Sequence, residues 1–189
     1  MVRNLKIVLL GTTNVGKTSI IHRYCSNEFY GNNPPTIQVA SFQKTIEINS
    51  EEVTLNICDT AGQEVYQSVC PNFYRNADAI IVVFALDNKD SMIKAQGWFD
   101  ELSATMQNKV PIFTVGNKSD LRQEGLMPRD DCILFAESNK SEFIETSAKD
   151  NIGINDLFEA AAKNAYERVM HETVGYPTMN RKTDSVACF

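Results

Sequence analysis

The residues best suited to chemistry lie in the segment from Gly11 to Thr18, whose sequence is Gly-Thr-Thr-Asn-Val-Gly-Lys-Thr. Glycines at its two turning points let the main chain curve tightly and approach an anion, so that backbone N–H groups surround a polyphosphate. Lys17 adds a positive charge toward the terminal phosphates, and the Thr18 hydroxyl can bind Mg²⁺. The segment predicts a nucleoside triphosphate site, without choosing between ATP and GTP.

A second polar segment, Asn117-Lys118-Ser119-Asp120, follows an apolar run that ends at Val115. A carboxylate in the plane of a purine, such as that of Asp120, accepts hydrogen bonds from the N1–H and 2-amino groups of guanine. Adenine has neither donor, and a buried polar group without a partner costs about 1–3 kcal/mol. The segment therefore predicts that the bound base is guanine.

Two further segments supply groups for the same ligand. Asp59-Thr60-Ala61-Gly62-Gln63-Glu64 follows a predicted strand, so that Asp59 can hold Mg²⁺ through water and Gly62 can offer its N–H to the terminal phosphate. Glu145-Thr146-Ser147-Ala148-Lys149 follows a short apolar pair. Its backbone N–H groups can meet the guanine carbonyl, and Lys149 can cover the ring.

The elements that must position these segments alternate between strand and helix. Short apolar or alternating runs predict strands at 5–10, 53–57, 79–86 and 111–115. The expected helices are 17–26, one around Trp98, and one whose apolar stripe runs from Ile154 to Val169. Strands that alternate with helices of this size predict an α/β domain with a mainly parallel sheet.

Composition limits the class of protein. The chain has 189 residues and a net charge of −6, which suits one domain and argues against broad binding to nucleic-acid phosphates. The longest apolar run, 79–86, is far below the ~20 residues of a membrane-spanning helix. Neither the start of the chain nor its five cysteines and two histidines follow an export, zinc-site or triad pattern, so we expect a cytosolic protein with reduced thiols.

In their order and spacing, these four segments resemble the motifs of the small GTPase superfamily. The chain is most similar to its Rab branch, and more weakly to the early-endosomal type within it, over residues 5–172. The resemblance implies a three-layer α/β P-loop GTPase fold, in which helices cover both faces of a mostly parallel six-stranded sheet. We therefore expect a small GTPase domain over residues 1–172 and a flexible C-terminal tail over residues 173–189.

The resemblance also implies roles for individual residues. Lys17 stabilises charge on the γ-phosphate, and Gln63 orients the attacking water. The implied Mg²⁺ ligands are Thr18, Thr36 and Asp59. The implied GTP- and GDP-binding residues are Asn14, Val15, Gly16, Lys17, Thr18, Ser19, Phe29, Thr36, Gly62, Asn117, Lys118, Asp120, Ser147, Ala148 and Lys149. No arginine occupies an evident finger position, so unaided hydrolysis should be slow.

As a Rab-like switch in vesicle traffic, the protein is expected to be a cytoplasmic monomer that meets a guanine-nucleotide exchange factor, a GTPase-activating protein and effectors, but no nucleic acid. Attachment to the cytosolic face of endomembranes depends on Cys188, which is followed only by Phe189 and so lacks a C-a-a-X box. One lipid gives only reversible attachment, in which a prenyl-binding chaperone would assist. Two states of Cys188 are therefore considered, one in which it carries a geranylgeranyl group and one in which its thiol is unmodified.

Some residues depart from the Rab pattern. Thr13 and Asn14 stand where many relatives have smaller residues, and their side chains could crowd an incoming arginine finger. Partner-facing positions also differ, namely Gln38, Ala40, Cys58 and Val65-Tyr66. Two alternatives follow: a GTP-locked or hydrolysis-poor regulatory scaffold, and a signalling GTPase of Ras or Rho type. A P-loop kinase is disfavoured because few arginines lie near the motifs to form an acceptor site.

Overall fold

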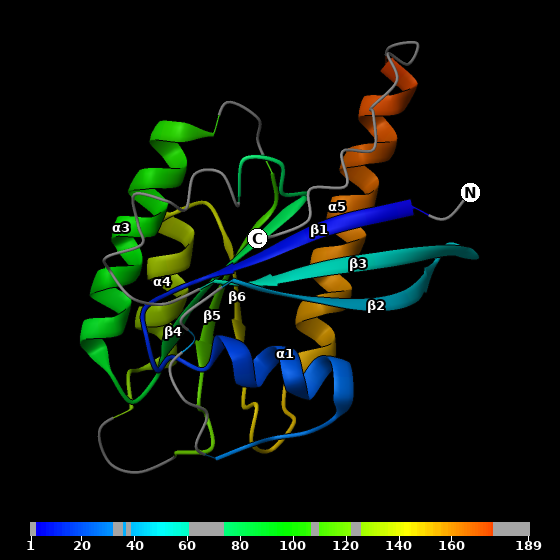
Figure 1. The fold of residues 1–189 in the computed structure, drawn as a ribbon. Helices are drawn as coiled ribbons and strands as arrows, with labels where there is room; N and C mark the ends of the chain where they lie inside the picture. Colours follow the sequence, from blue (N-terminus) through cyan, green and yellow to red (C-terminus); the bar gives the residue numbers. More distant parts are fainter. Residues whose placement is uncertain are drawn as a thin grey trace.

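Six strands form one sheet in the order β2-β3-β1-β4-β5-β6 (Figure 1). This computed structural model describes residues 3–31, 36, 39–60, 74–106, 110–121 and 126–175. The strands are β1 (Arg3–Leu10), β2 (Ala40–Ile48), β3 (Glu51–Asp59), β4 (Ala79–Ala85), β5 (Ile112–Asn117) and β6 (Glu142–Glu145). Neighbouring strands run parallel except β2 and β3, which pair antiparallel.

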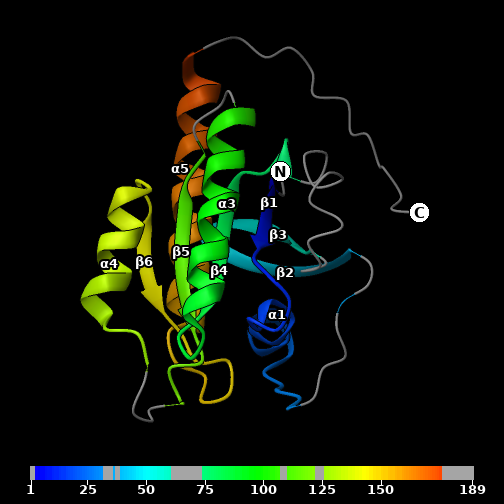
Figure 2. The same ribbon diagram turned by 90° about the vertical axis from the view of Figure 1, so that its left-hand side faces the viewer.

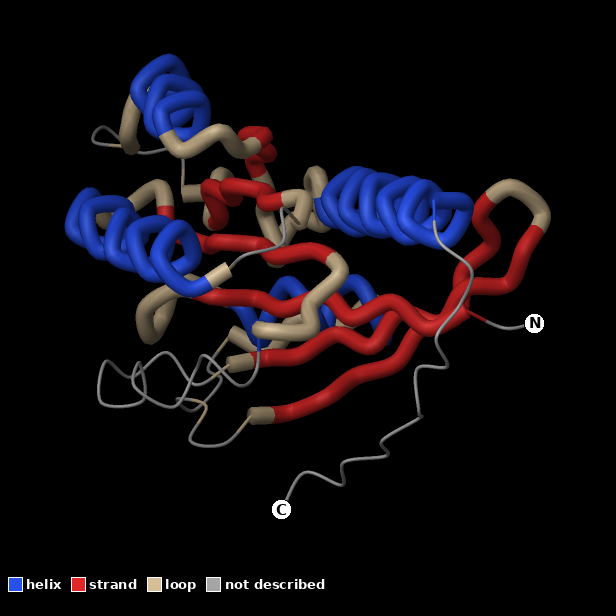
Figure 3. Tube along the Cα trace, turned by 90° about the horizontal axis from the view of Figure 1, so that it is seen from above, coloured by secondary structure: helices blue, strands red, loops and turns tan. Residues whose placement is uncertain are grey.

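Helices cover both faces of this sheet. They are α1 (Lys17–Ser26), α3 (Lys89–Thr105), α4 (Arg129–Ser138) and α5 (Ile154–Gly175). In Figure 1, α3 and α4 lie at the left, whereas α5 lies in the right half, where β1, β2 and β3 cross it in this view; Figure 3 shows the same sheet from above, with helices on both sides. The three layers agree with the fold that the sequence predicts.

The burial pattern of the strands explains this layering. Leu5, Ile7 and Leu9 of β1 pack in a core with α1 and α5, whereas Val8 and Leu10 pack in a second core with α3. All residues of β4 are buried, as expected for a central parallel strand. In β2, at the edge of the sheet, partly buried and exposed residues alternate instead.

The parallel arrangement determines where the predicted motifs meet. Because β1, β4, β5 and β6 run in the same direction, the loops that follow their carboxyl ends gather at one edge of the sheet. In Figure 2 this edge is at the bottom, where α1 also lies. The segments after β1, β5 and β6 therefore come together although they are far apart in the sequence.

The predicted elements agree with the observed ones to within a few residues. The strands predicted at 5–10, 79–86 and 111–115 correspond to β1, β4 and β5, and the helix predicted at 17–26 is α1. Helix α5 reaches Gly175, three residues past the expected domain boundary at Glu172. The remaining tail, 176–189, lies outside the described residues. No helix among the described residues is long and apolar enough to cross a membrane.

Candidate functional site

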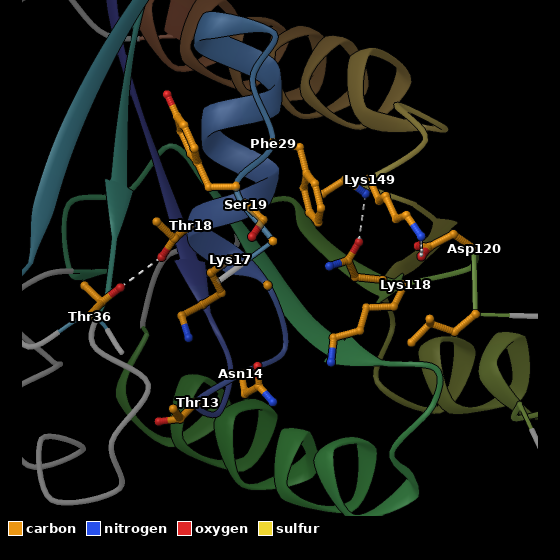
Figure 4. A pocket seen from close by; sticks show the side chains of 16 residues that line it. Thr13, Asn14, Lys17, Thr18, Ser19, Phe29, Thr36, Lys118, Asp120 and Lys149 are labelled. Atoms are coloured by element: carbon orange, nitrogen blue, oxygen red, sulfur yellow. Dashed lines mark hydrogen bonds and ion pairs between the residues drawn. The ribbon is translucent and has the colours of Figure 1, made fainter. Parts of the chain in front are cut away.

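A cavity of about 540 Å³ lies at the carboxyl edge of the sheet, and most of the predicted nucleotide-binding residues line it (Figure 4). The lining comes from the loop before α1, the start of α1, the segment after α1, Thr36, and the loops after β5 and β6. The lining residues are Thr13, Asn14, Gly16, Lys17, Thr18, Ser19, Phe29, Tyr30, Gly31, Thr36, Asn117, Lys118, Asp120, Leu121, Ala148 and Lys149.

The loop between β1 and α1 needs both of its glycines. A Cβ on Gly11 would lie 2.3 Å from the Val83 carbonyl oxygen, and one on Gly16 would lie 2.3 Å from Asn117 Nδ2. Both residues have positive φ angles, 145° and 96°, in the range that favours glycine. The loop is therefore packed tightly against β4 and β5, and its main chain faces the cavity at the N-terminus of α1, where anions bind.

Lys17 lies across this loop with its side chain buried. Its Nζ donates hydrogen bonds to the carbonyl oxygens of Gly11 at 2.8 Å and Thr12 at 3.0 Å. An ammonium group held in this way adds a fixed positive charge to the backbone N–H groups of the loop. This end of the cavity is suited to a polyphosphate.

Three predicted Mg²⁺ ligands meet beside the phosphate loop. Thr18 Oγ1 donates to Asp59 Oδ2 at 2.6 Å and lies 2.9 Å from Thr36 Oγ1. Burial raises the pKa of Asp59, and the hydrogen bond from Thr18 and the charge of Lys17 lower it in part. Asp59 Oδ1 is buried without a hydrogen-bond partner among the described residues.

These three residues fit a hard cation. Mg²⁺ prefers oxygen ligands and usually combines one or two protein groups with phosphate oxygens and water. The Asp59 carboxylate, with Oδ1 lacking a partner among the described residues and with two hydroxyls beside Oδ2, offers such a set. The described residues contain no cluster of three or more His, Cys, Asp or Glu that could hold a metal ion.

Asn117 connects the two ends of the cavity. Its Nδ2 donates to the Val15 carbonyl in the phosphate loop at 2.9 Å. Its Oδ1 accepts from Thr146 Oγ1 at 3.1 Å and from the Ala148 N–H at 3.3 Å. Because the side chain is buried and hydrogen-bonded at both Nδ2 and Oδ1, Asn117 fixes the position of one loop relative to the other.

Asp120 is held at the opposite end from the phosphate loop. Ser147 Oγ donates to Asp120 Oδ1 at 2.7 Å, and Lys149 Nζ lies 3.9 Å from Asp120 Oδ2. The Asp120 side chain is only 8% exposed, so its carboxylate is both oriented and shielded from water. Figure 4 shows Lys17, Thr18 and Thr36 at one end of the cavity, and Phe29, Asp120 and Lys149 at the other.

Some predicted residues lie elsewhere. Val15 and Ser147 do not line the cavity: Val15 is in the core and contributes its carbonyl to Asn117, and Ser147 orients Asp120. Gly62, Gln63 and Cys188 lie outside the described residues, as do Gln38 and Val65-Tyr66.

Other residues of the site are not predicted by the sequence motifs. Tyr30, Gly31 and Leu121 line the cavity beside predicted residues, and their neighbourhood in sequence was the available signal. Lys118 Nζ lies 3.5 Å from Asp87 Oδ1, an ion pair that joins the loops after β5 and β4. Arg23 contacts the loop after β6 from α1, and nothing in its sequence context indicates this contact.

Comparison with known proteins agrees with this geometry. Residues 6–167 match the model of the Ras family. Ras-related protein Rab-17 of Mus musculus is 42% identical over 164 residues, which cover 86% of this chain and 76% of that protein. Ras-related protein Rab5A of Oryza sativa subsp. japonica is 39% identical over 162 residues, covering 86% and 80%. Ras-related protein Rab-21 of Dictyostelium discoideum is 39% identical over 156 residues, covering 82% and 74%.

The chain therefore belongs to the Ras family of small GTPases, proteins that bind guanine nucleotides and hydrolyse GTP. Within this family its relatives place it in the Rab branch. Fold, family and enzymatic class are thus as the motifs of the sequence predict.

Proposed function

We propose that the cavity binds GTP or GDP with Mg²⁺ and that the chain uses it as a slow, partner-stimulated switch in vesicle traffic. The observation that carries this proposal is the placement of Lys17 and Asp120 in one cavity, with Asn117 bonded to the loops at both ends. One guanine nucleotide would therefore place its phosphates at Lys17 and its base at Asp120.

At the base end, Asp120 would accept hydrogen bonds from guanine, with its carboxylate oriented by Ser147. Phe29 would lie against one edge of the base, and Lys149, 58% exposed in its side chain, would cover the ring. A site that offers an acceptor pair to two donors rejects a purine without them, because the acceptor sites of the carboxylate that face the base would stay without donors.

At the phosphate end, the residues would stabilise the negative charge of the phosphates. Lys17 and the loop N–H groups would stabilise the negative charge that develops on the γ-phosphate oxygens. Thr18, Thr36 and Asp59 would hold Mg²⁺, which when bound supplies further positive charge between the phosphates. The family resemblance gives Gln63 the role of orienting the attacking water, and Gly62 that of donating to the γ-phosphate.

The switch would follow from Thr36 and Gly62. By the family resemblance, the terminal phosphate would hold the segments of both residues, so loss of that phosphate would release these segments and change the surface that partners bind. From its similarity to Rab proteins, we expect the chain to bind three classes of partner: an exchange factor, an activating protein and effectors. They also support reversible attachment to endomembranes, for which Cys188 is the candidate lipid site.

The alternative of a hydrolysis-poor scaffold rests on a specific observation. Thr13 and Asn14 both line the cavity, where their side chains would meet a catalytic arginine supplied by a partner. We favour a working GTPase because Lys17, Thr18 and Thr36 line that end of the cavity and Thr18 is hydrogen-bonded to Asp59.

Single-turnover hydrolysis tests this choice. Protein loaded with radiolabelled GTP and Mg²⁺ should release phosphate slowly, with a rate on the order of 10⁻⁴ s⁻¹, as is typical of Ras-type GTPases without an activating protein. A Gln63→Leu variant should bind GTP equally well and release phosphate at least ten times more slowly, because leucine cannot orient water. Equal rates for the two proteins would favour the scaffold.

A further inference from the structure

Arg23, in the last turn of α1, makes contacts that the nucleotide-binding roles above do not use. Its Nε donates to the Ala148 carbonyl at 2.8 Å, and its Nη2 donates to the Lys149 carbonyl at 3.0 Å. Its Nη1 donates to the Asn27 carbonyl at 2.8 Å and to Asn27 Oδ1 at 3.2 Å. One guanidinium group therefore holds two segments that are more than a hundred residues apart in the sequence.

These two segments carry residues that line the base end of the cavity, and each forms one of its walls: Ala148 and Lys149 belong to one wall and Phe29 to the other. Ala148 and Lys149 line the cavity on one side. Asn27 ends α1 with a left-handed φ of 57°, and the chain that follows it carries Phe29 to the other side. Figure 4 shows Phe29 and Lys149 at this end of the cavity. Arg23 itself is not among the lining residues, so it acts on the cavity only through these walls.

The geometry of the contacts suits a clamp. Arginine presents its N–H donors in a rigid planar fork, so several hydrogen bonds form from one fixed orientation. Hydrogen bonds from a charged donor are also stronger than neutral ones. Phe29 is 37% exposed, which means that packing alone holds its wall weakly. If the walls separated, all of the contacts of Arg23 with one of them would break.

We propose that Arg23 is a positioning residue that keeps the two walls closed on the guanine base and so slows the release of bound nucleotide. This inference rests on the proposed function, which places guanine between these walls. The contacts of Arg23 involve neither the phosphate loop nor Thr18, Thr36 and Asp59. Arg23 therefore controls how long the nucleotide stays and leaves the rate of hydrolysis unchanged.

The test is the release of fluorescently labelled GDP, in Mg²⁺, after addition of excess unlabelled GDP. Arg23→Ala removes every contact of the fork and should release GDP about ten times faster, the change expected when charge-assisted hydrogen bonds are lost. Arg23→Lys keeps the charge and the side-chain stem, but one ammonium group cannot reproduce the planar fork. We expect it to release GDP at least three times faster than the wild type.

Arg3→Ala is the matched control. Arg3 lies at the amino end of β1, away from the cavity, and its ion pair with Glu51 has an Nε–Oε2 distance of 3.5 Å. Its loss changes the net charge as Arg23→Ala does, so that GDP release at the wild-type rate is expected. A second readout separates positioning from general loosening: single-turnover hydrolysis of bound GTP should have the same rate in wild type, Arg23→Ala and Arg23→Lys.

Each outcome decides the proposal. Release at the wild-type rate in the Arg23 variants would overturn it, as would faster release accompanied by an equal loss of hydrolysis. If Arg23→Ala does not fold, Arg23→Lys decides alone. A wild-type protein that does not retain labelled GDP overturns the proposed function itself, a result distinct from a failure of the clamp.

Discussion

At the scale of single residues, hydroxyl groups orient the two carboxylates on which the site depends. Thr18 Oγ1 donates to Asp59, and Ser147 Oγ donates to Asp120. Each hydroxyl fixes one oxygen of a carboxylate that the proposed function assigns to Mg²⁺ or to guanine. Orientation of this kind matters because a hydrogen bond weakens steeply when its geometry is poor.

The predicted effect of removing one of these hydroxyls is a weaker hold on guanine. Ser147→Ala takes away the donor to Asp120 and also the acceptor of the Asp150 N–H at 3.0 Å. A hydrogen bond to a charged group contributes about 1.5–3 kcal/mol, so the affinity for GDP should fall roughly 10- to 100-fold. Isothermal titration calorimetry measures this change.

Ser119→Ala is the matched control for that experiment. Ser119 is also buried in a loop of the site, but its Oγ has no hydrogen-bond partner among the described residues. Removing a buried hydroxyl without a partner leaves no other group unpaired, so GDP affinity and melting temperature should stay the same or rise slightly. Equal losses in the two variants would contradict the assigned role of Ser147.

At the scale of elements, the junction of β1 with α1 determines the shape of the phosphate end. Gly16 precedes α1 in a left-handed conformation and lies against the Asn117 side chain of β5. This one position thus joins helix, loop and strand. The close approach explains why the motif requires glycine there.

A glycine-to-alanine pair tests this requirement. In Gly16→Ala the new Cβ meets Asn117 Nδ2, which is also the donor to Val15, so both GDP binding and folding stability should fall. Gly97→Ala lies within α3, where an added Cβ meets nothing within 4 Å. Alanine is the better helix former, and we expect the free energy of unfolding to rise by about 0.5–1 kcal/mol. Urea denaturation compares the two; a stable, GDP-binding Gly16→Ala protein would be the contradictory result.

Much of the element level could be predicted from the sequence, for reasons that differ between elements. The strand β4 is a continuous apolar run, and α5 has a regular apolar stripe. The spacing and length of the apolar residues were therefore enough to predict both elements. The contacts of Arg23 could not be predicted, because they join a helix to a loop through backbone carbonyls, which leave no mark on the sequence. The burial of Asn117 and its bonds to both loops likewise depend on the order of the strands, in which β4 and β5 lie between β1 and β6.

At the scale of the whole molecule, a second polar network lies at the amino ends of the strands, away from the cavity. Arg168 of α5 donates from Nη2 to Asp78 Oδ1 at 3.1 Å, and the Lys6 N–H of β1 donates to Asp78 Oδ2 at 2.9 Å. The side chains of Arg168 and Asp78 are only 17% and 11% exposed. This network attaches the C-terminal helix to the centre of the sheet.

Breaking this ion pair should destabilise the fold without affecting the nucleotide site. Arg168→Ala removes a charged donor from the partly buried Asp78 carboxylate, which keeps its hydrogen bond from the Lys6 N–H, and the free energy of unfolding should fall by about 1.5–3 kcal/mol. Glu172→Ala is the control, because Glu172 is 51% exposed in its side chain and pairs with Arg168 at the surface. Its loss should cost no more than about 0.5 kcal/mol. Chemical denaturation distinguishes the two, and equal costs would contradict the structural role of the network.

The central claim is that one cavity holds a polyphosphate at Lys17 and selects guanine at Asp120. Calorimetric titration of nucleotide-free protein with GDP and with ADP, in Mg²⁺, tests it most directly. We predict that GDP binds at least roughly 100-fold more tightly than ADP, because adenine offers no donor to the acceptor sites of Asp120 that face the base. We also predict that Asp120→Ala removes most of this preference. Equal or tighter binding of ADP by the wild-type protein would contradict the account.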